Sequence, residues 1–278
     1  MPYSASMGKE KILKAETTAP YAPRTILITG ASGGIGAELA RTYAAPGRKL
    51  VLWGRNPQKL ADLATQCCSL GATVETREVD LCDGQAALSA YREDDAASRP
   101  DLVILGAGLS DIQTPGSTTE SPDKVLQLAQ VNYSTPVALA TAAARGMAER
   151  GGGRIALFGS VAAFYELPFA ASYSSSKAGL AFFAKAAGLG WRQHDIAVTL
   201  IAPGFVDTPM SQRLEGPRPF LVSAKKAARL CARAIARRQA VCVFPWPFRV
   251  LEVLTRLVPQ GLRERILLAL AVGQKDAR

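Results

Sequence analysis

The sequence predicts an α/β protein with a single doubly wound, mostly parallel sheet. Short β-rich apolar runs alternate along the chain with longer stretches of helical spacing. Runs that are apolar throughout, and that helices separate, are typical of strands covered on both faces. In such a sheet, ligands are expected beyond the carboxyl ends of the strands.

The predicted elements follow one another from Arg24 onward. Strands are expected at residues 25–29, 49–53, 73–79, 102–106, 154–159, 197–203 and 241–247. Helices are expected to begin at Gly34, at Pro57 and near Asp83, and then to cover residues 122–149 and 173–191.

The chain divides into three segments. Its 278 residues, of which 48% are hydrophobic, are enough to bury one full core. Residues 1–23 are polar, show no sustained periodicity and are expected to form a surface tail. Residues 24–245 form the predicted α/β domain. Residues 246–278 form a short extension, in which Pro259 and Gly261 separate two amphipathic helices.

The net charge of +10 fits a nucleic acid, an anionic membrane surface or an anionic cofactor as a partner, and charge alone does not choose among them. The one local excess of basic residues, between Arg229 and Arg238, has helical spacing and is interpreted as a solvated helix face.

The five cysteines form no CxxC pair, and the only histidine, His194, lies in a polar turn. The sequence therefore indicates neither a metal site nor a disulfide framework. The N-terminus lacks the apolar core of a signal peptide, and no apolar stretch reaches the roughly 18 residues of a membrane-spanning helix. We expect a cytoplasmic protein with reduced thiols.

A glycine-rich turn closes the first predicted strand and opens the first helix. Gly30 and Gly34 let the backbone turn sharply and approach a pyrophosphate, whose charge would face free N–H groups at the helix start. An ordinary glycine turn is the alternative. The position between a strand and a helix favours nucleotide binding.

The second strand leads to Gly54 and Arg55, where an NAD-binding protein would carry an acidic residue for the ribose hydroxyl. Arg55 instead offers a guanidinium suited to a 2′-phosphate, so NADP(H) is favoured over NAD(H). The alternative is a solvated loop arginine. After the third strand, Asp80 and Leu81 are candidates for contact with the adenine, although Asp80 would equally suit a helix N-cap.

Tyr173 and Lys177 are four residues apart, which places both side chains on one face of a helix. A neighbouring cation favours the phenolate and so lowers the pKa of a tyrosine, which suits a general acid or base. A surface tyrosine beside a solvated lysine is the alternative.

Taken together, these motifs resemble those of the short-chain dehydrogenase/reductase family, and the match runs in order from about residue 24 to residue 245. Residues 29–36 resemble its TGxxxGxG cofactor turn, and residues 173–177 its YxxxK pair. The further matches to family landmarks are Ser160, Asn132, Pro203, Gly204 and Thr208. One departure is visible: Leu105-Gly106-Ala107-Gly108 stands where the family usually has N-N-A-G, so two side-chain amides are missing.

The resemblance implies a Rossmann-like fold and a hydride-transferring oxidoreductase. Its implied catalytic residues are Ser160 on the substrate carbonyl, Tyr173 as general acid or base, Lys177 as its tuner and ribose ligand, and Asn132 holding a relay water. The expected cofactor-binding residues are Gly30, Ser32, Gly33, Gly34, Ile35, Gly36, Arg55, Asp80, Leu81, Ala107, Gly108, Tyr173, Lys177, Pro203, Gly204, Val206 and Thr208.

The resemblance also assigns substrate choice to residues 207–221 and the C-terminal extension. Phe164, Tyr165 and Leu167 are interpreted as an apolar pocket wall, with a core role as the alternative. We expect an apolar carbonyl or alcohol substrate. The family further implies a homodimer or homotetramer built on the helices at residues 122–149 and 173–191.

Two alternatives from other classes remain open. A non-catalytic NADP-binding sensor or scaffold would keep the glycine turn and Arg55, but would not need Ser160, Tyr173 and Lys177. A basic nucleic-acid or membrane-surface protein would show clustered charge with interleaved aromatics, which only the C-terminal extension partly does. We expect no nucleic-acid partner. Peripheral membrane contact through the C-terminal helices is the alternative to their packing on this domain or a sister subunit.

Overall fold

The computed structural model describes residues 21–113, 116–250, 261 and 273–274. The predicted tail up to residue 20 and nearly all of the two predicted C-terminal helices lie outside the described residues.

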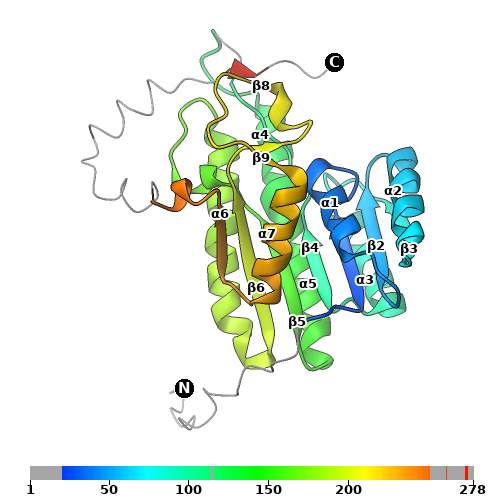
Figure 1. Ribbon diagram of the computed structural model, residues 1–278. Coiled ribbons are helices and arrows are strands. Elements are labelled where there is room, and N and C mark those ends of the chain that lie inside the picture. Colours follow the sequence, from blue (N-terminus) through cyan, green and yellow to red (C-terminus); the bar gives the residue numbers. More distant parts are fainter. Residues whose placement is uncertain (1–20, 114–115, 251–260, 262–272, 275–278) are drawn as a thin grey trace, which may run out of the picture.

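A seven-stranded parallel sheet forms the centre of the protein, in the order β10-β6-β5-β4-β1-β2-β3 (Figure 1). Its strands are β1 (Thr25–Thr29), β2 (Lys49–Gly54), β3 (Thr73–Glu78), β4 (Leu102–Leu105), β5 (Gly153–Phe158), β6 (Ile196–Pro203) and β10 (Val241–Phe244). The predicted doubly wound, Rossmann-like single domain is therefore confirmed. The order reverses between β1 and β4, which is where such sheets bind ligands.

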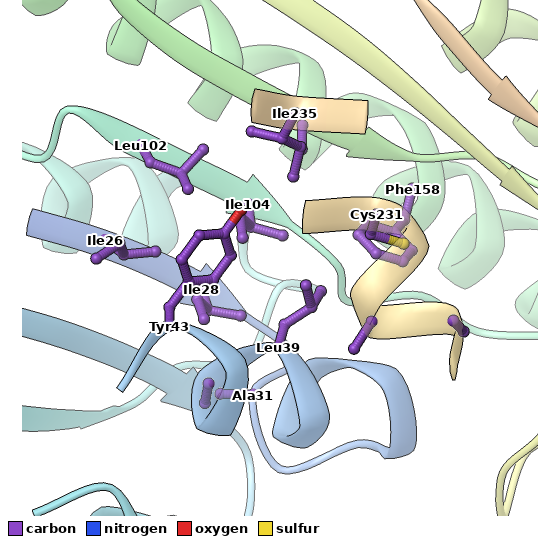
Figure 2. Close-up of a cluster of buried hydrophobic side chains, with 14 of the residues drawn as sticks. Ile26, Ile28, Ala31, Leu39, Tyr43, Leu102, Ile104, Phe158, Cys231 and Ile235 are labelled. Atoms are coloured by element: carbon purple, nitrogen blue, oxygen red, sulfur yellow. The ribbon is translucent and has the colours of Figure 1, made fainter. Parts of the chain in front are cut away.

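Helices cover both faces of the sheet. They are α1 (Gly34–Tyr43), α2 (Pro57–Ser69), α3 (Gly84–Ser98), α4 (Pro122–Ala129), α5 (Thr135–Glu149), α6 (Ala171–Gly190) and α7 (Ala224–Ala236). One buried cluster joins α1, α2 and α7 to the sheet, and a second joins α3, α5 and α6 to it. Figure 2 shows the first cluster, to which α7 contributes Cys231 and Ile235, β1 contributes Ile28 and α1 contributes Leu39.

The helix predicted at residues 122–149 is confirmed in its bounds and is unbroken, but it is not regular throughout. Between α4 and α5 the helix contains one π-helical turn, η1 (Gln130–Ser134), in which Asn132 is buried. The last strand also ends earlier than predicted, at Phe244, because Pro245 has no N–H to donate to the sheet.

Two small strand pairs sit beyond the carboxyl edge of the sheet. The strand β7 (Val206–Asp207) pairs with β9 (Val222–Ser223), and β8 (Leu214–Glu215) pairs with β11 (Gly273–Gln274). Residues 207–221, the predicted substrate loop, are therefore held at both ends by β7 and β9.

At the opposite, amino edge of the sheet, the start of the described chain is fastened to the domain. The guanidinium of Arg154 lies 3.4 Å from the centre of the Tyr21 ring, and the Tyr21 hydroxyl donates to the Asp101 carbonyl at 3.2 Å. Arg154 also donates to the Ala236 carbonyl, at 2.6 Å, and so closes the end of α7.

Two surface interpretations hold. The basic residues Arg229 and Arg233 lie on the exposed side of α7, and His194 is exposed in a short turn after α6. Across the part of the chain that the structure describes, no helix combines the length and apolarity needed to cross a bilayer.

Candidate active site

The glycine turn after β1 is built so closely that side chains would not fit. Gly30 has a φ of +69°, and a Cβ there would lie 2.7 Å from the Cα of Ala107. A Cβ on Gly36 would overlap the carbonyl oxygen of Gly30. These two glycines therefore let the start of α1 lie directly against the ends of β1 and β4.

The start of α1 is open to an anion. Its cap residue is Gly33, no side-chain hydrogen bond caps it, and its first turn holds no acidic residue. The first N–H groups of the helix thus keep their partial positive charge. A Cβ on Gly34 would lie 2.8 Å from the Cβ of Thr208, so the threonine predicted for the cofactor site lies beside this helix start.

The end of β2 contributes Gly54 and Arg55. A Cβ on Gly54 would lie 2.8 Å from the hydroxyl of Ser32, which explains the glycine at this point. Arg55 is exposed. Burial and Asp80 raise the pKa of the Cys82 thiol, whereas the positive charge of Arg55 lowers it. The electrostatic effect of Arg55 therefore reaches the turn that follows β3.

The alternative role of Asp80 as a helix cap is wrong. The cap of α3 is Asp83, whose carboxylate accepts from the Ala86 N–H at 2.9 Å. Asp80 instead accepts from the N–H of Cys82 at 3.0 Å and is exposed, while Leu81 is buried.

The turn after β4 lacks the two amides usual in the family, yet it is hydrogen-bonded. The Ala107 N–H donates to the Thr29 hydroxyl at 3.3 Å, which links the ends of β4 and β1. A Cβ on Gly108 would lie 3.2 Å from both the Lys177 ammonium and the Asn132 side-chain oxygen. This turn therefore joins the glycine turn to the catalytic candidates.

Asn132 is fully buried in the π-helical turn. Its oxygen accepts from the Leu109 N–H at 2.8 Å, and its nitrogen donates to the Leu109 carbonyl at 2.9 Å. The amide of Asn132 thereby fixes the loop that leaves β4. π-helical turns recur at functional sites, which agrees with the predicted importance of this residue.

Lys177 is 4% exposed and donates from its ammonium to the Phe158 carbonyl at 2.8 Å. Burial lowers its pKa to about 8. Its ammonium lies 6.0 Å from the centre of the Tyr173 ring, so the two residues share one side of α6, as the spacing predicts.

Ser160 and Tyr173 meet in front of this lysine. Burial raises the pKa of Tyr173, and its hydrogen bond with Ser160 opposes that rise. The Ser160 hydroxyl also accepts from the Ala162 N–H at 3.1 Å. Burial and the hydrogen bond with Ser160 are the two causes of the shift in the Tyr173 pKa. That Lys177 lowers this pKa therefore stays a prediction.

The segment after β6 closes the site from the other side. Gly204 follows the strand, and a Cβ there would lie 2.5 Å from the ring of Phe248. Phe248 is 9% exposed, and its ring centre lies 5.9 Å from that of Phe220 and 6.4 Å from that of Phe205. The sequence leaves open whether this extension packs on the domain, on a sister subunit or on a membrane, and no spacing in it indicates that Phe248 contacts Gly204.

Comparison with known proteins identifies a family whose match includes these residues. Residues 24–218 match the short chain dehydrogenase family. An uncharacterized oxidoreductase of Myxococcus xanthus is 33% identical over 244 residues, which are 86% of this chain and 94% of that protein. Dehydrogenase/reductase SDR family member 7B of Bos taurus is 34% identical over 193 residues, 67% of this chain but only 59% of that protein.

Among solved structures, a short-chain dehydrogenase from Sphingobium yanoikuyae in complex with NADPH superimposes with a TM-score of 0.72 at 26% identity. It covers 92% of this chain and 98% of its own. Since these matches run through the glycine turn and the helix of Tyr173 and Lys177 alike, the chain belongs to the short chain dehydrogenase family, whose members are nicotinamide-dependent oxidoreductases.

Proposed function

We propose that this protein is an NADP(H)-dependent oxidoreductase that interconverts a carbonyl and a secondary alcohol. The observation that carries the proposal is a connected group of four residues: Lys177 and Asn132 lie beside Gly108, Tyr173 lies beside Lys177, and Ser160 is hydrogen-bonded to Tyr173.

The residues present fit a dinucleotide. The uncapped start of α1 suits a pyrophosphate, and the missing Cβ of Gly108 leaves room directly beside the Lys177 ammonium. Lys177 would hold the nicotinamide ribose, and Arg55 the 2′-phosphate. The segment from Pro203 to Thr208 would hold the nicotinamide ring. When bound, the cofactor supplies or accepts the hydride.

In the reductive direction the protein stabilises and protonates the developing alkoxide. The Ser160 hydroxyl donates a hydrogen bond to the substrate oxygen. Tyr173 delivers its hydroxyl proton to that oxygen. Its hydrogen bond with Ser160 keeps the two hydroxyl groups close enough to contact the same substrate oxygen. Lys177 stabilises the resulting tyrosinate by its charge, and Asn132 holds the relay water that returns the proton. Oxidation of an alcohol reverses these steps.

The surroundings of the site support an apolar substrate. Apolar side chains of the loop after β7 are exposed: Met210 by 40%, Phe220 by 55% and Leu221 by 44%. Exposed apolar groups lose contact with water when an apolar ligand covers them, and Phe220 packs on Phe248, which lies against Gly204 of the proposed cofactor site.

A second apolar surface supports a homo-oligomer. Leu126 of α4 is 71% exposed and Phe182 of α6 is 79% exposed. Between the two helices lies a hollow of about 450 Å³ bordered by Val125, Tyr133 and Gly179. A second copy of the chain would cover this face. We also propose that the protein works in the cytoplasm. The alternative of peripheral membrane contact rests on residues that are mostly outside the described part of the chain.

The first test is a titration of tryptophan fluorescence with NADPH and with NADH. We expect NADPH to bind more tightly, and Arg55→Glu to weaken NADPH binding by about tenfold or more while leaving NADH binding nearly unchanged. Arg237→Glu is the matched control, because it makes the same charge change on an exposed arginine at the far end of α7.

A panel of carbonyl substrates follows, with apolar aryl and alkyl ketones beside sugars. Reduction of an apolar ketone with loss of NADPH absorbance is the expected result. Failure of both nucleotides to bind would overturn the proposed function, and equal affinity for both in wild type and Arg55→Glu would overturn the preference for NADP(H).

A further inference from the structure

The catalytic helix α6 starts without a cap of its own. Its cap residue is Ala170, which has no polar side chain. Helix starts leave N–H groups without helical partners, and a side chain close in sequence usually satisfies one of them. Here the partner comes from elsewhere in the chain.

Glu120, in the loop before α4, supplies the missing cap. Its carboxylate accepts from the Ser172 N–H at 2.9 Å through one oxygen and lies 3.3 Å away through the other. It also accepts from the Ser172 hydroxyl at 2.9 Å. Ser172 directly precedes Tyr173, so this carboxylate is bound one residue away from the proposed general acid.

A carboxylate suits this place for two reasons. The start of a helix carries partial positive charge, which a negative group stabilises. Hydrogen bonds to an ionised acceptor are shorter and stronger than those to a neutral one. Because 52 residues separate Glu120 from Ser172, the cap is also a tertiary connection between two loops of the site.

The loop that carries Glu120 is hydrogen-bonded to its surroundings at three of its described residues, Leu109, Gln113 and Glu120. Near its start, Leu109 is bound on both sides of its backbone by Asn132. In its middle, the Gln113 N–H donates to the Phe169 carbonyl at 2.9 Å, just before α6. At its end, Glu120 holds Ser172. The loop thus spans from the π-helical turn to the first turn of the catalytic helix.

We propose that Glu120 is a positioning residue for the reaction: its carboxylate fixes the first turn of α6 and so holds the Tyr173 hydroxyl against Ser160. The proposal rests on the function proposed above. Glu120 touches neither the substrate nor the cofactor and acts through Ser172. Its loss therefore slows proton transfer, while the glycine turn and the start of α1, which the proposal assigns to the pyrophosphate, belong to other elements and keep their structure.

The test compares three variants of the full-length protein. Glu120→Ala removes the cap, and Glu120→Gln keeps an acceptor oxygen of the same reach without the charge. Asp123→Ala is the matched control, since it removes an exposed carboxylate three residues on, in the first turn of α4. Each variant is measured for kcat and KM with the ketone found in the panel, and for the dissociation constant of NADPH.

We expect Glu120→Ala to lower kcat about tenfold, since a small misplacement of a catalytic group is enough for such a loss. KM and NADPH affinity should stay within about twofold, and Glu120→Gln should recover most of kcat. An unchanged kcat in Glu120→Ala would overturn the proposal. So would a joint loss of kcat, NADPH affinity and thermal stability that glutamine does not rescue, because this is the pattern of general structural damage.

Hydrogen exchange separates this proposal from the proposed function. In Glu120→Ala, the amides of residues 172–175 should exchange at least about tenfold faster than in wild type and Asp123→Ala. If the wild-type protein reduces no ketone but amide exchange in Glu120→Ala rises as expected, the proposed function is wrong and the capping role of Glu120 is supported. Unchanged exchange overturns the cap whether or not the enzyme is active.

Discussion

The two sides of the active site are built differently. On the cofactor side, Ile26, Ile28 and Leu39 are fully buried, and a Cβ on Gly30, Gly34 or Gly36 of the turn would collide with a neighbouring atom. On the substrate side, Phe220 and Leu221 leave 55% and 44% of their surfaces exposed. The first side is complete before any ligand arrives. The second keeps apolar surface that the proposed substrate would cover, so the proposed function combines a fixed cofactor site with an adaptable substrate site.

The largest expected effect lies where the two sides meet. Tyr173→Phe removes the proposed acid and should lower kcat by about 10³-fold, the usual contribution of a positioned proton donor. NADPH affinity should stay unchanged, because the phenyl ring still fills the site. Tyr133→Phe, which removes a hydroxyl from the outer face of the π-helical turn, is the control and should retain full activity. A loss of less than about tenfold in Tyr173→Phe would show that another group protonates the product.

The next effect tests how rigid the cofactor side is. Gly30→Ala puts a Cβ 2.7 Å from Ala107 at a positive φ, and we expect it to lower the free energy of unfolding by about 3 kcal/mol and to abolish NADPH binding. Gly47→Ala carries a similar φ of +76° but has open space around it, so it should cost only about 1 kcal/mol. Urea unfolding of both variants measures the difference. Equal losses would mean that backbone strain, and not close packing, explains Gly30.

On the substrate side, Phe248→Ala removes the ring that packs on Gly204 and Phe220. We expect KM for an apolar ketone to rise about tenfold, and kcat and NADPH affinity to change by less than about threefold. Trp246→Ala, two residues earlier and 74% exposed, serves as the control and should change KM by less than about twofold. A larger effect of Trp246 would place the substrate on the outer surface of this segment.

The smallest effect concerns pH. Burial lowers the pKa of Lys177 to about 8, so the free protein loses the ammonium charge between about pH 7 and about pH 9. A cofactor that binds the charged amine then binds less tightly as pH rises. We expect the dissociation constant of NADPH to rise about threefold to tenfold over this interval, and Lys177→Met to bind weakly at all pH values without this dependence. A flat profile in wild type would remove Lys177 from the cofactor site.

What the sequence predicts well is local. The strands follow from apolar runs, the glycine turn from its place between a strand and a helix, and the shared side of Tyr173 and Lys177 from helical spacing. The π-helical turn at Asn132 gives no such signal, since residues 122–149 read as one regular helix. The cap of α6 by Glu120 depends on two loops meeting in the folded chain. Contacts of this kind are set by the topology of the whole sheet, which periodicity along one segment does not contain.

The stacking of Tyr21 on Arg154 has a practical consequence for anyone who trims the protein. A shortened chain that starts at Arg24, where the sequence pattern places the beginning of the domain, would keep every strand but lose the ring that covers this guanidinium. Arg154 is only 9% exposed, so trimming would expose its guanidinium to water and remove the cation–π contact that fastens this end of the domain. A start at or before Pro20 keeps the aromatic cover and is the better choice for crystallisation.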